Sequence, residues 1–125
     1  MNQKDIAYIL GFDSPLAQFA IECNSHARQA YKVQTGEDGI SLPDPVAMSI
    51  ALDPSVGTEW SDHYVDVETQ SELTRGMTVV DRLNVAEDDR NRAIWAPVLR
   101  AQCKTKVCWG IDTRRWKEAL FAALR

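Results

Sequence analysis

The apolar residues in the first third of the chain recur at the spacing of an α-helix. Asp5–Leu10 predicts a short helix. A longer helix is expected to begin at Ser14, because a serine hydroxyl caps a helix well and Pro15 suits the first helical position. Apolar positions continue at helical spacing to Tyr31, and Gly36 ends the pattern. The sequence therefore predicts two helices in this part of the chain.

A further apolar helix follows a loop. It is expected to open at Asp44–Pro45, with Asp44 as its N-cap. It should end at Asp53–Pro54, because the residue before a proline avoids the helical region. Its residues from Val46 to Leu52 are apolar on nearly all sides, which predicts a buried helix.

The second half of the chain changes to the period of a β-strand. Val65 and Val67 alternate with acidic residues, which indicates a half-buried strand. We expect a last helix to begin with Asp112 as its N-cap and to bury Trp116 and Leu124. The expected elements of this half are strands at 63–69, 77–80 and 103–111, a charged loop at 82–102 with a short helix near 92–99, and the final helix from 112.

These elements predict an α/β protein with helices first and a small group of strands later. Three short strands and a buried helix make a poor independent unit, so we expect the sheet to be incomplete. The chain should then expose apolar surface and tend to associate, with Val46, Ile50 and Val67 as candidates for that surface.

Composition excludes some classes of partner. The formal net charge of −4 argues against a nucleic-acid surface, which needs concentrated Lys and Arg. No stretch approaches the ~20 apolar residues of a membrane span, and the N-terminus lacks the apolar core of a signal peptide. The odd cysteine count favours the cytoplasm, and we expect Cys23, Cys103 and Cys108 to be buried as small hydrophobic residues.

Asp44 is the main candidate for chemistry. As an N-cap it would need no further role, but a carboxylate at a helix N-terminus can also ligate a hard cation such as Ca²⁺. The residue chemistry alone favours the cap, and the two roles are compatible. Trp60 follows the apolar helix closely and is a candidate to border a pocket and to contact substrate there. His63 could act as a general acid, although a side chain at the start of a strand is the simpler interpretation, and His26 is expected at the surface.

The chain resembles the inosine/uridine-preferring nucleoside hydrolases. The resemblance is carried by three segments, Leu42–Ser55, Val65–Asp81 and Lys104–Leu124. It covers essentially the whole chain but only the C-terminal part of the family's length, which implies that residues 1–125 are the C-terminal portion of a nucleoside hydrolase domain. The family hydrolyses the N-glycosidic bond of ribonucleosides, with a Ca²⁺ ion that holds the ribose hydroxyls and the attacking water. The resemblance implies that Asp44 is a metal ligand and contacts substrate, and that Ca²⁺ is the cofactor.

The chain departs from the family in three places. The N-terminal Asp-rich motif, which supplies the other carboxylate ligands and the base, has no counterpart here. The ribose-binding Asn/Glu/Asn segment is also absent. Many members carry His where this chain has Pro43, so the resemblance assigns no acid for the leaving base and no catalytic residue.

Two functions from different classes are compatible with this pattern. The chain is either part of an enzyme that works only with its missing half, or a catalytically dead remnant or interaction module. In the first case the partners are the missing N-terminal half or a second copy of the chain, and the substrate is a ribonucleoside.

Overall fold

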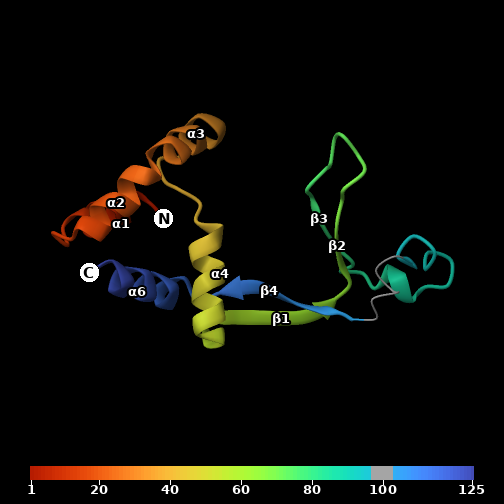
Figure 1. The fold of residues 1–125 in the computed structure, drawn as a ribbon. Helices are drawn as coiled ribbons and strands as arrows, with labels where there is room; N and C mark the ends of the chain where they lie inside the picture. The colour runs from red at the N-terminus through yellow and green to blue at the C-terminus, as the bar shows by residue number, and fades with distance from the viewer. Residues whose placement is uncertain (97–102) are drawn as a thin grey trace. The chain divides into compact units, whose positions relative to one another are not determined.

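The computed structural model describes residues 1–96 and 103–125, which form two compact units. Unit 1 comprises Met1–Gly57 and Ile111–Arg125, and unit 2 comprises Thr58–Gly110 (Figure 1). Helices build unit 1 and short strands dominate unit 2, which confirms the expected α/β class. Within the described residues, no helix is both long enough and apolar enough to cross a membrane.

Unit 1 is helical, and two of its caps were predicted correctly. The Ser14 hydroxyl accepts a hydrogen bond from the amide of Ala17 at 3.4 Å. The Asp112 carboxylate accepts bonds from the amides of Arg114 and Arg115. The elements are α1 Gln3–Leu10, α2 Pro15–Cys23, α3 Ser25–Thr35, α4 Pro43–Leu52, the 3-10 helix η1 Pro54–Val56 and α6 Thr113–Leu124.

The expectation of a single helix from Ser14 to the stop at Gly36 is wrong, because the chain breaks at Asn24 between α2 and α3. The side-chain amide of Asn24 donates to the carbonyl of Ala20 at 2.9 Å. In a continuous helix that carbonyl would accept the backbone N–H of Asn24. The side chain therefore competes with the helical hydrogen bond, as short polar residues often do.

The core of unit 1 joins helices from both ends of the chain. Ile9 of α1, Ala17 of α2 and Leu124 of α6 are buried together. Beside them, the rings of Phe12 and Phe121 meet edge to face with centroids 6.1 Å apart. The predicted apolar face of the last helix is thus confirmed.

The loop between α3 and α4 is attached to the first residues of the chain. The amide of Ile40 donates to the carbonyl of Met1 at 2.9 Å, and Asn2 and Gly39 form an antiparallel bridge. A Cβ atom at Gly39 would lie 2.7 Å from the Met1 carbonyl oxygen, a distance that backbone cannot accommodate without moving. Glycine therefore permits this close approach.

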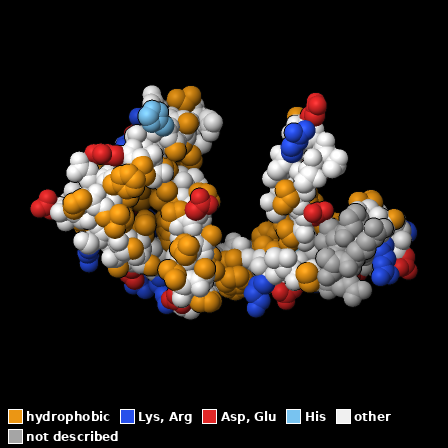
Figure 2. Space-filling view, in the orientation of Figure 1, with side chains coloured by type: hydrophobic (Ala, Val, Ile, Leu, Met, Phe, Trp, Pro, Cys, Tyr) orange, Lys and Arg blue, Asp and Glu red, His pale blue; other side chains and the backbone are white. Residues whose placement is uncertain are grey.

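The expectation that α4 is buried is wrong, since none of its residues is buried in unit 1. Met48 is 59% exposed and Leu52 is 80% exposed. We expected Val46 and Ile50 at an exposed apolar surface. Both side chains are half-buried, so they are partly but not fully exposed. Figure 2 shows many hydrophobic side chains at the surface of the helical unit.

Unit 2 contains two small sheets, each with two strands among the described residues. In one sheet β2 pairs antiparallel with β3, so that Val65 lies opposite Val80. In the other β1 pairs with β4, and the two strands run in opposite directions (Figure 1). The elements are β1 Gly57–His63, β2 Val65–Val67, β3 Thr78–Val80, the 3-10 helix η2 Val85–Glu87 and β4 Thr105–Ile111.

Strand β1 was not predicted, because Gly57–His63 lacks alternating apolar residues. His63 therefore ends a strand instead of starting one. Of the short helix expected near residues 92–99, residues 92–95 form turns and Ala96 is helical, while residues 97–99 lie outside the described part of the chain. Cys23 and Cys103 are exposed and Cys108 is half-buried, so the expectation of three buried cysteines is wrong.

His63 is buried in a polar network that connects β1, β4 and the residue after β3. Its Nδ1 lies 2.9 Å from the backbone oxygen of Asp81, and its Nε2 lies 2.8 Å from Ser61 Oγ. A carbonyl can only accept, so in the neutral ring Nδ1 carries the proton and the Ser61 hydroxyl donates to Nε2. The indole N–H of Trp109 donates to the same hydroxyl at 2.6 Å.

We expect Ser61→Ala to destabilise the protein, because the substitution leaves the Trp109 indole N–H and His63 Nε2 without their partner. An unsatisfied buried polar group costs about 1–3 kcal/mol of unfolding free energy. Urea unfolding followed by tryptophan fluorescence measures this loss. Ser41→Ala is the control, since Ser41 is exposed and such substitutions change stability by less than about 0.5 kcal/mol. Equal stability of the two variants would contradict the network.

The Asp38 carboxyl makes the stability of unit 1 depend on pH in the acidic range. Arg28 Nη2 lies 2.9 Å from Asp38 Oδ1. This hydrogen bond is the largest cause of a pKa for the Asp38 carboxyl that is lowered from 3.8 to about 2, and hydrogen bonds from Gln3 and Lys32 lower the pKa further. A depressed pKa means that this contribution to stability is present above pH 3.8 and is lost as pH falls through about 2.

We expect the Asp38 carboxyl to titrate near pH 2 in the native protein and Arg28→Met to move its midpoint back toward 3.8. Removing the guanidinium takes away the largest stabiliser of the charged form. An NMR titration of the side-chain carbonyl carbon measures both midpoints. An unchanged midpoint in the variant would show that Arg28 does not set this pKa.

Candidate functional site

Asp44 lies in the first turn of α4 but does not cap the helix. The helix begins at Pro43 with Leu42 as N-cap, and within residues 1–96 and 103–125 no side-chain hydrogen bond caps it. The predicted N-cap role of Asp44 is therefore wrong, because the helix starts two residues earlier than expected. The carboxylate is exposed and has no hydrogen bond or ion pair within the described part of the chain. The helix dipole still favours a negative charge at this position.

The described residues do not form a complete metal site. Among residues 1–96 and 103–125, no group of three or more His, Cys, Asp or Glu side chains could hold an ion. Ca²⁺ takes six to eight oxygen ligands, of which a single carboxylate supplies at most two. Asp44 thus fits one ligand position by its chemistry, and the residues of this chain alone do not fit the full shell.

Trp60, the second predicted substrate contact, lies in β1 of unit 2 and is 37% exposed. Asp44 belongs to unit 1, so the two predicted residues come from different units. The role of Trp60 in substrate binding stays a prediction.

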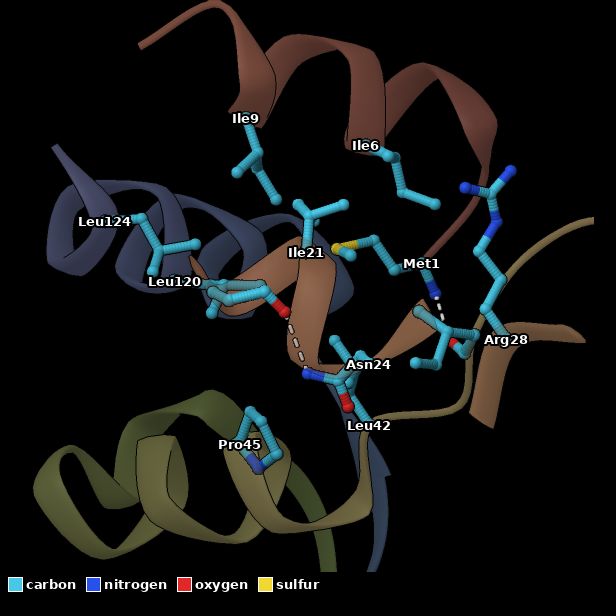
Figure 3. A pocket seen from close by; sticks show the side chains of 12 residues that line it. Met1, Ile6, Ile9, Ile21, Asn24, Arg28, Leu42, Pro45, Leu120 and Leu124 are labelled. Atoms are coloured by element: carbon cyan, nitrogen blue, oxygen red, sulfur yellow. Dashed lines mark hydrogen bonds between the residues drawn. The ribbon is translucent and has the colours of Figure 1, made fainter. Parts of the chain in front are cut away.

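A pocket in unit 1 lies between α1, α2, α6 and the start of α4 (Figure 3). Its volume is about 80 Å³, and nearly all of its lining is apolar. The two polar side chains at its wall already have partners: Asn24 donates to Ala20, and Arg28 pairs with Asp38. A ribose site needs several polar groups that converge on the hydroxyls. This pocket is therefore a gap in apolar packing and not a nucleoside site.

A second hollow is the groove between α4 and α6, with a volume of about 270 Å³. Arg115 Nη2 lies 3.0 Å from Asp53 Oδ2 and joins α6 to the C-terminal end of α4. Near the start of α6, the buried indole Nε1 of Trp116 has no hydrogen-bond partner among the residues that the structure describes. The apolar part of the groove is lined by Pro45, Met48, Leu52, Val56, Ala119, Leu120 and Ala123.

Ser61 Oγ lies 2.8 Å from His63 Nε2, a distance at which a histidine can act as the base for a serine nucleophile. The surrounding contacts favour a structural role instead. In a serine hydrolase a carboxylate orients the histidine. Here a backbone carbonyl holds His63, while the Asp81 carboxylate accepts from the amides of Val85 and Ala86 at the start of η2. Sequence reasoning missed Ser61 and Asp81. The spacing of two residues between Ser61 and His63 was the available signal, since such residues share a strand face.

Comparison with known proteins identifies the fold. A model of the inosine-uridine preferring nucleoside hydrolase family matches residues 1–118. The pyrimidine-specific ribonucleoside hydrolase RihA of Shewanella baltica is 35% identical over 92 residues, which are 73% of this chain and 29% of that protein. RihA of Shewanella sp. strain ANA-3 is 41% identical, again over 73% of this chain and 29% of the relative.

Two solved structures share the fold. The plant nucleoside hydrolase PpNRh1 superposes with a TM-score of 0.77 and 22% identity, over 99% of this chain and 36% of that one. The purine-preferring ribonucleoside hydrolase from Gardnerella vaginalis gives a TM-score of 0.65 and 18% identity, over 99% and 35%. The chain thus spans about a third of the length of the proteins it matches. With the family match extending over nearly all of its residues, the chain belongs to the inosine-uridine preferring nucleoside hydrolase family.

Proposed function

We propose that this chain is the C-terminal part of a Ca²⁺-dependent nucleoside hydrolase and supplies Asp44 as one ligand of the metal. The observation that carries the proposal is an exposed carboxylate, without an ion pair in the described structure, at the first turn of α4 in a chain of this family. The reaction is hydrolysis of the N-glycosidic bond of a ribonucleoside to ribose and free base. Alone, the chain is inactive.

The chemistry of Asp44 suits this role. Its oxygens are hard ligands of the kind that Ca²⁺ prefers. Within the described residues no cation competes for the carboxylate, and the helix dipole favours its charge. A bound Ca²⁺ would supply positive charge that orients ribose hydroxyls and lowers the pKa of a bound water. The remaining ligands must come from the part of the domain that this chain does not contain.

The other residues of the chain limit what it contributes to catalysis. Trp60 is proposed to offer an aromatic face to the substrate, since such rings combine apolar area with a defined orientation. Pro43 carries no acid or base, so another residue must protonate the leaving base. The matched relatives differ in base, pyrimidine for RihA and purine for the Gardnerella enzyme. The substrate is therefore proposed only as a ribonucleoside. The free cysteines suit the reducing cytoplasm, which we propose as its location.

The test uses a chimera in which this chain replaces the matched segment of Shewanella baltica RihA. We expect Asp44→Asn to lower the rate of ribose release from uridine by about a hundredfold or more. Loss of a residue that only orients a metal ligand costs about 10–100-fold, so loss of a ligand itself should cost more. Asn keeps the shape but loses the charge and one metal-binding oxygen. The free energy of unfolding in EDTA should change by less than about 1 kcal/mol, the size of a helix-dipole contribution.

Asp89→Asn in the same chimera is the matched control, because Asp89 is also exposed and its loss should leave turnover unchanged. The isolated chain, assayed with uridine, inosine and Ca²⁺, should release no ribose. If the Asp44→Asn chimera keeps its Ca²⁺ affinity and turnover, Asp44 is not a ligand. A chimera without any activity would favour the alternative of a dead remnant or an interaction module.

A further inference from the structure

The C-terminal end of α4 carries an oriented carboxylate, that of Asp53. The amide of Asp53 donates to the carbonyl of Ser49 at 2.9 Å, so this residue still belongs to the hydrogen-bond ladder of the helix. Its Oδ1 accepts from the amide and from the hydroxyl of Ser55, at 3.0 and 2.6 Å. The hydrogen bonds from Ser55 are the largest causes of a lowered pKa for the Asp53 carboxyl, and the charge of Arg115 lowers the pKa further.

Arg115 of α6 holds this end of α4 from the other side. Its Nη2 donates to Asp53 Oδ2 at 3.0 Å, and its Nη1 donates to the carbonyl of Ser55 at 3.2 Å. The backbone of Arg115 is itself fixed, because its amide donates to Asp112 Oδ1 at 3.1 Å. The amide of Asp112 in turn donates to the carbonyl of Val56 at 2.8 Å. We call Asp53, Ser55 and Arg115 together the α4–α6 clamp.

The α4–α6 clamp is suited to give α4 a direction rather than to stabilise the fold. The side chains of Arg115 and Asp53 are 42% and 51% exposed, and exposed ion pairs contribute little to stability. A planar guanidinium that donates from two nitrogens to two acceptors nevertheless fixes the orientation of the groups that it joins. Packing does less to fix the direction of α4, since none of its residues is buried in unit 1.

We propose that Arg115 is a positioning residue for the Asp44 carboxylate and acts through the direction of α4. This inference rests on the proposed function, because it needs Asp44 to be a metal ligand. Asp53 follows Asp44 by nine residues, which is about 13 Å along the helix axis. A rotation of α4 by about 5° about the clamp would therefore move Asp44 by about 1 Å. Oxygen ligands lie about 2.3–2.6 Å from Ca²⁺, so a displacement of that size takes an oxygen out of its coordination position.

The first experiment measures the direction of α4 in the isolated chain without metal. Residual dipolar couplings of the backbone amides in α4, compared with those in α1 and α2, give the angle of the helix. We expect Arg115→Met to change this angle by about 5° or more and to lower the α4 couplings, because the released helix samples several directions. Arg114→Met is the matched control, since the ion pair of Arg114 with Glu118 lies within α6. It should leave the angle unchanged.

The second experiment measures Ca²⁺ affinity by calorimetry and turnover of uridine in the RihA chimera. Arg115→Met should weaken Ca²⁺ binding and lower turnover by about tenfold or more, since a misplacement of about 1 Å can cost about 100-fold. In the Asp44→Asn chimera the same change should cost less than about twofold, because a positioning residue has no further effect once the carboxylate that it positions is gone. Arg114→Met should leave both quantities unchanged.

Arg115→Lys is the second variant, and it tests the clamp even if Arg115→Met does not fold. Lysine keeps the positive charge but lacks the planar pair of donor nitrogens that reaches Asp53 and the Ser55 carbonyl together. Its effects on the α4 angle and on Ca²⁺ affinity should lie between those of the unmodified protein and those of Arg115→Met.

Two outcomes would overturn the positioning role. The first is an α4 angle that is the same in the Arg115 variants as in Arg114→Met. The second is an equal loss of turnover from Arg115→Met in both chimera backgrounds, which a merely structural role of Arg115 would give. The proposed function fails separately: Asp44→Asn would leave Ca²⁺ affinity and turnover intact, while the α4 angle in the isolated chain would still respond to Arg115→Met.

Discussion

The packing of α6 against α1 and α2 is the interaction on which unit 1 depends. Leu124 and Ile9 meet although they lie at opposite ends of the chain, and the rings of Phe12 and Phe121 extend the same contact. The ion pair between Arg115 and Asp53 then attaches the end of α4 to α6. The position of α4, and with it Asp44, is therefore set by the last helix of the sequence.

This arrangement supports α4 on one side only. The helix has the composition of a core element but packs in unit 1 like a surface element. An apolar helix in that situation has a lower free energy when further surface covers it. Asp44 is incomplete in a similar way. One carboxylate cannot fill the coordination shell of a hard cation, but it can complete a shell whose other ligands come from other residues.

Local features of the fold were predictable from sequence, and features that depend on distant residues were not. Ser14 and Asp112 cap their helices through contacts two or three residues away, so their spacing carried the information. The exposure of α4 depends on which distant residues pack against it, and the apolar composition of the helix carries no information about them. Strand β1 lacks alternating apolar residues, and its pairing with β4, a segment more than 40 residues away in the sequence, is what identifies it as a strand. For the site, the helix bearing Asp44 was predictable, but its first residue was not.

Gly39 shows how a residue without functional groups can control the geometry of a carboxylate. A side chain at this position would collide with the Met1 carbonyl, and the short connection to α4 would have to move with it. Substitution at position 39 would thus require either the Met1 backbone or the loop that leads to α4 to shift, without any change to Asp44 itself. Sequence variation at this remote loop is constrained by the same chemistry as variation in the site itself.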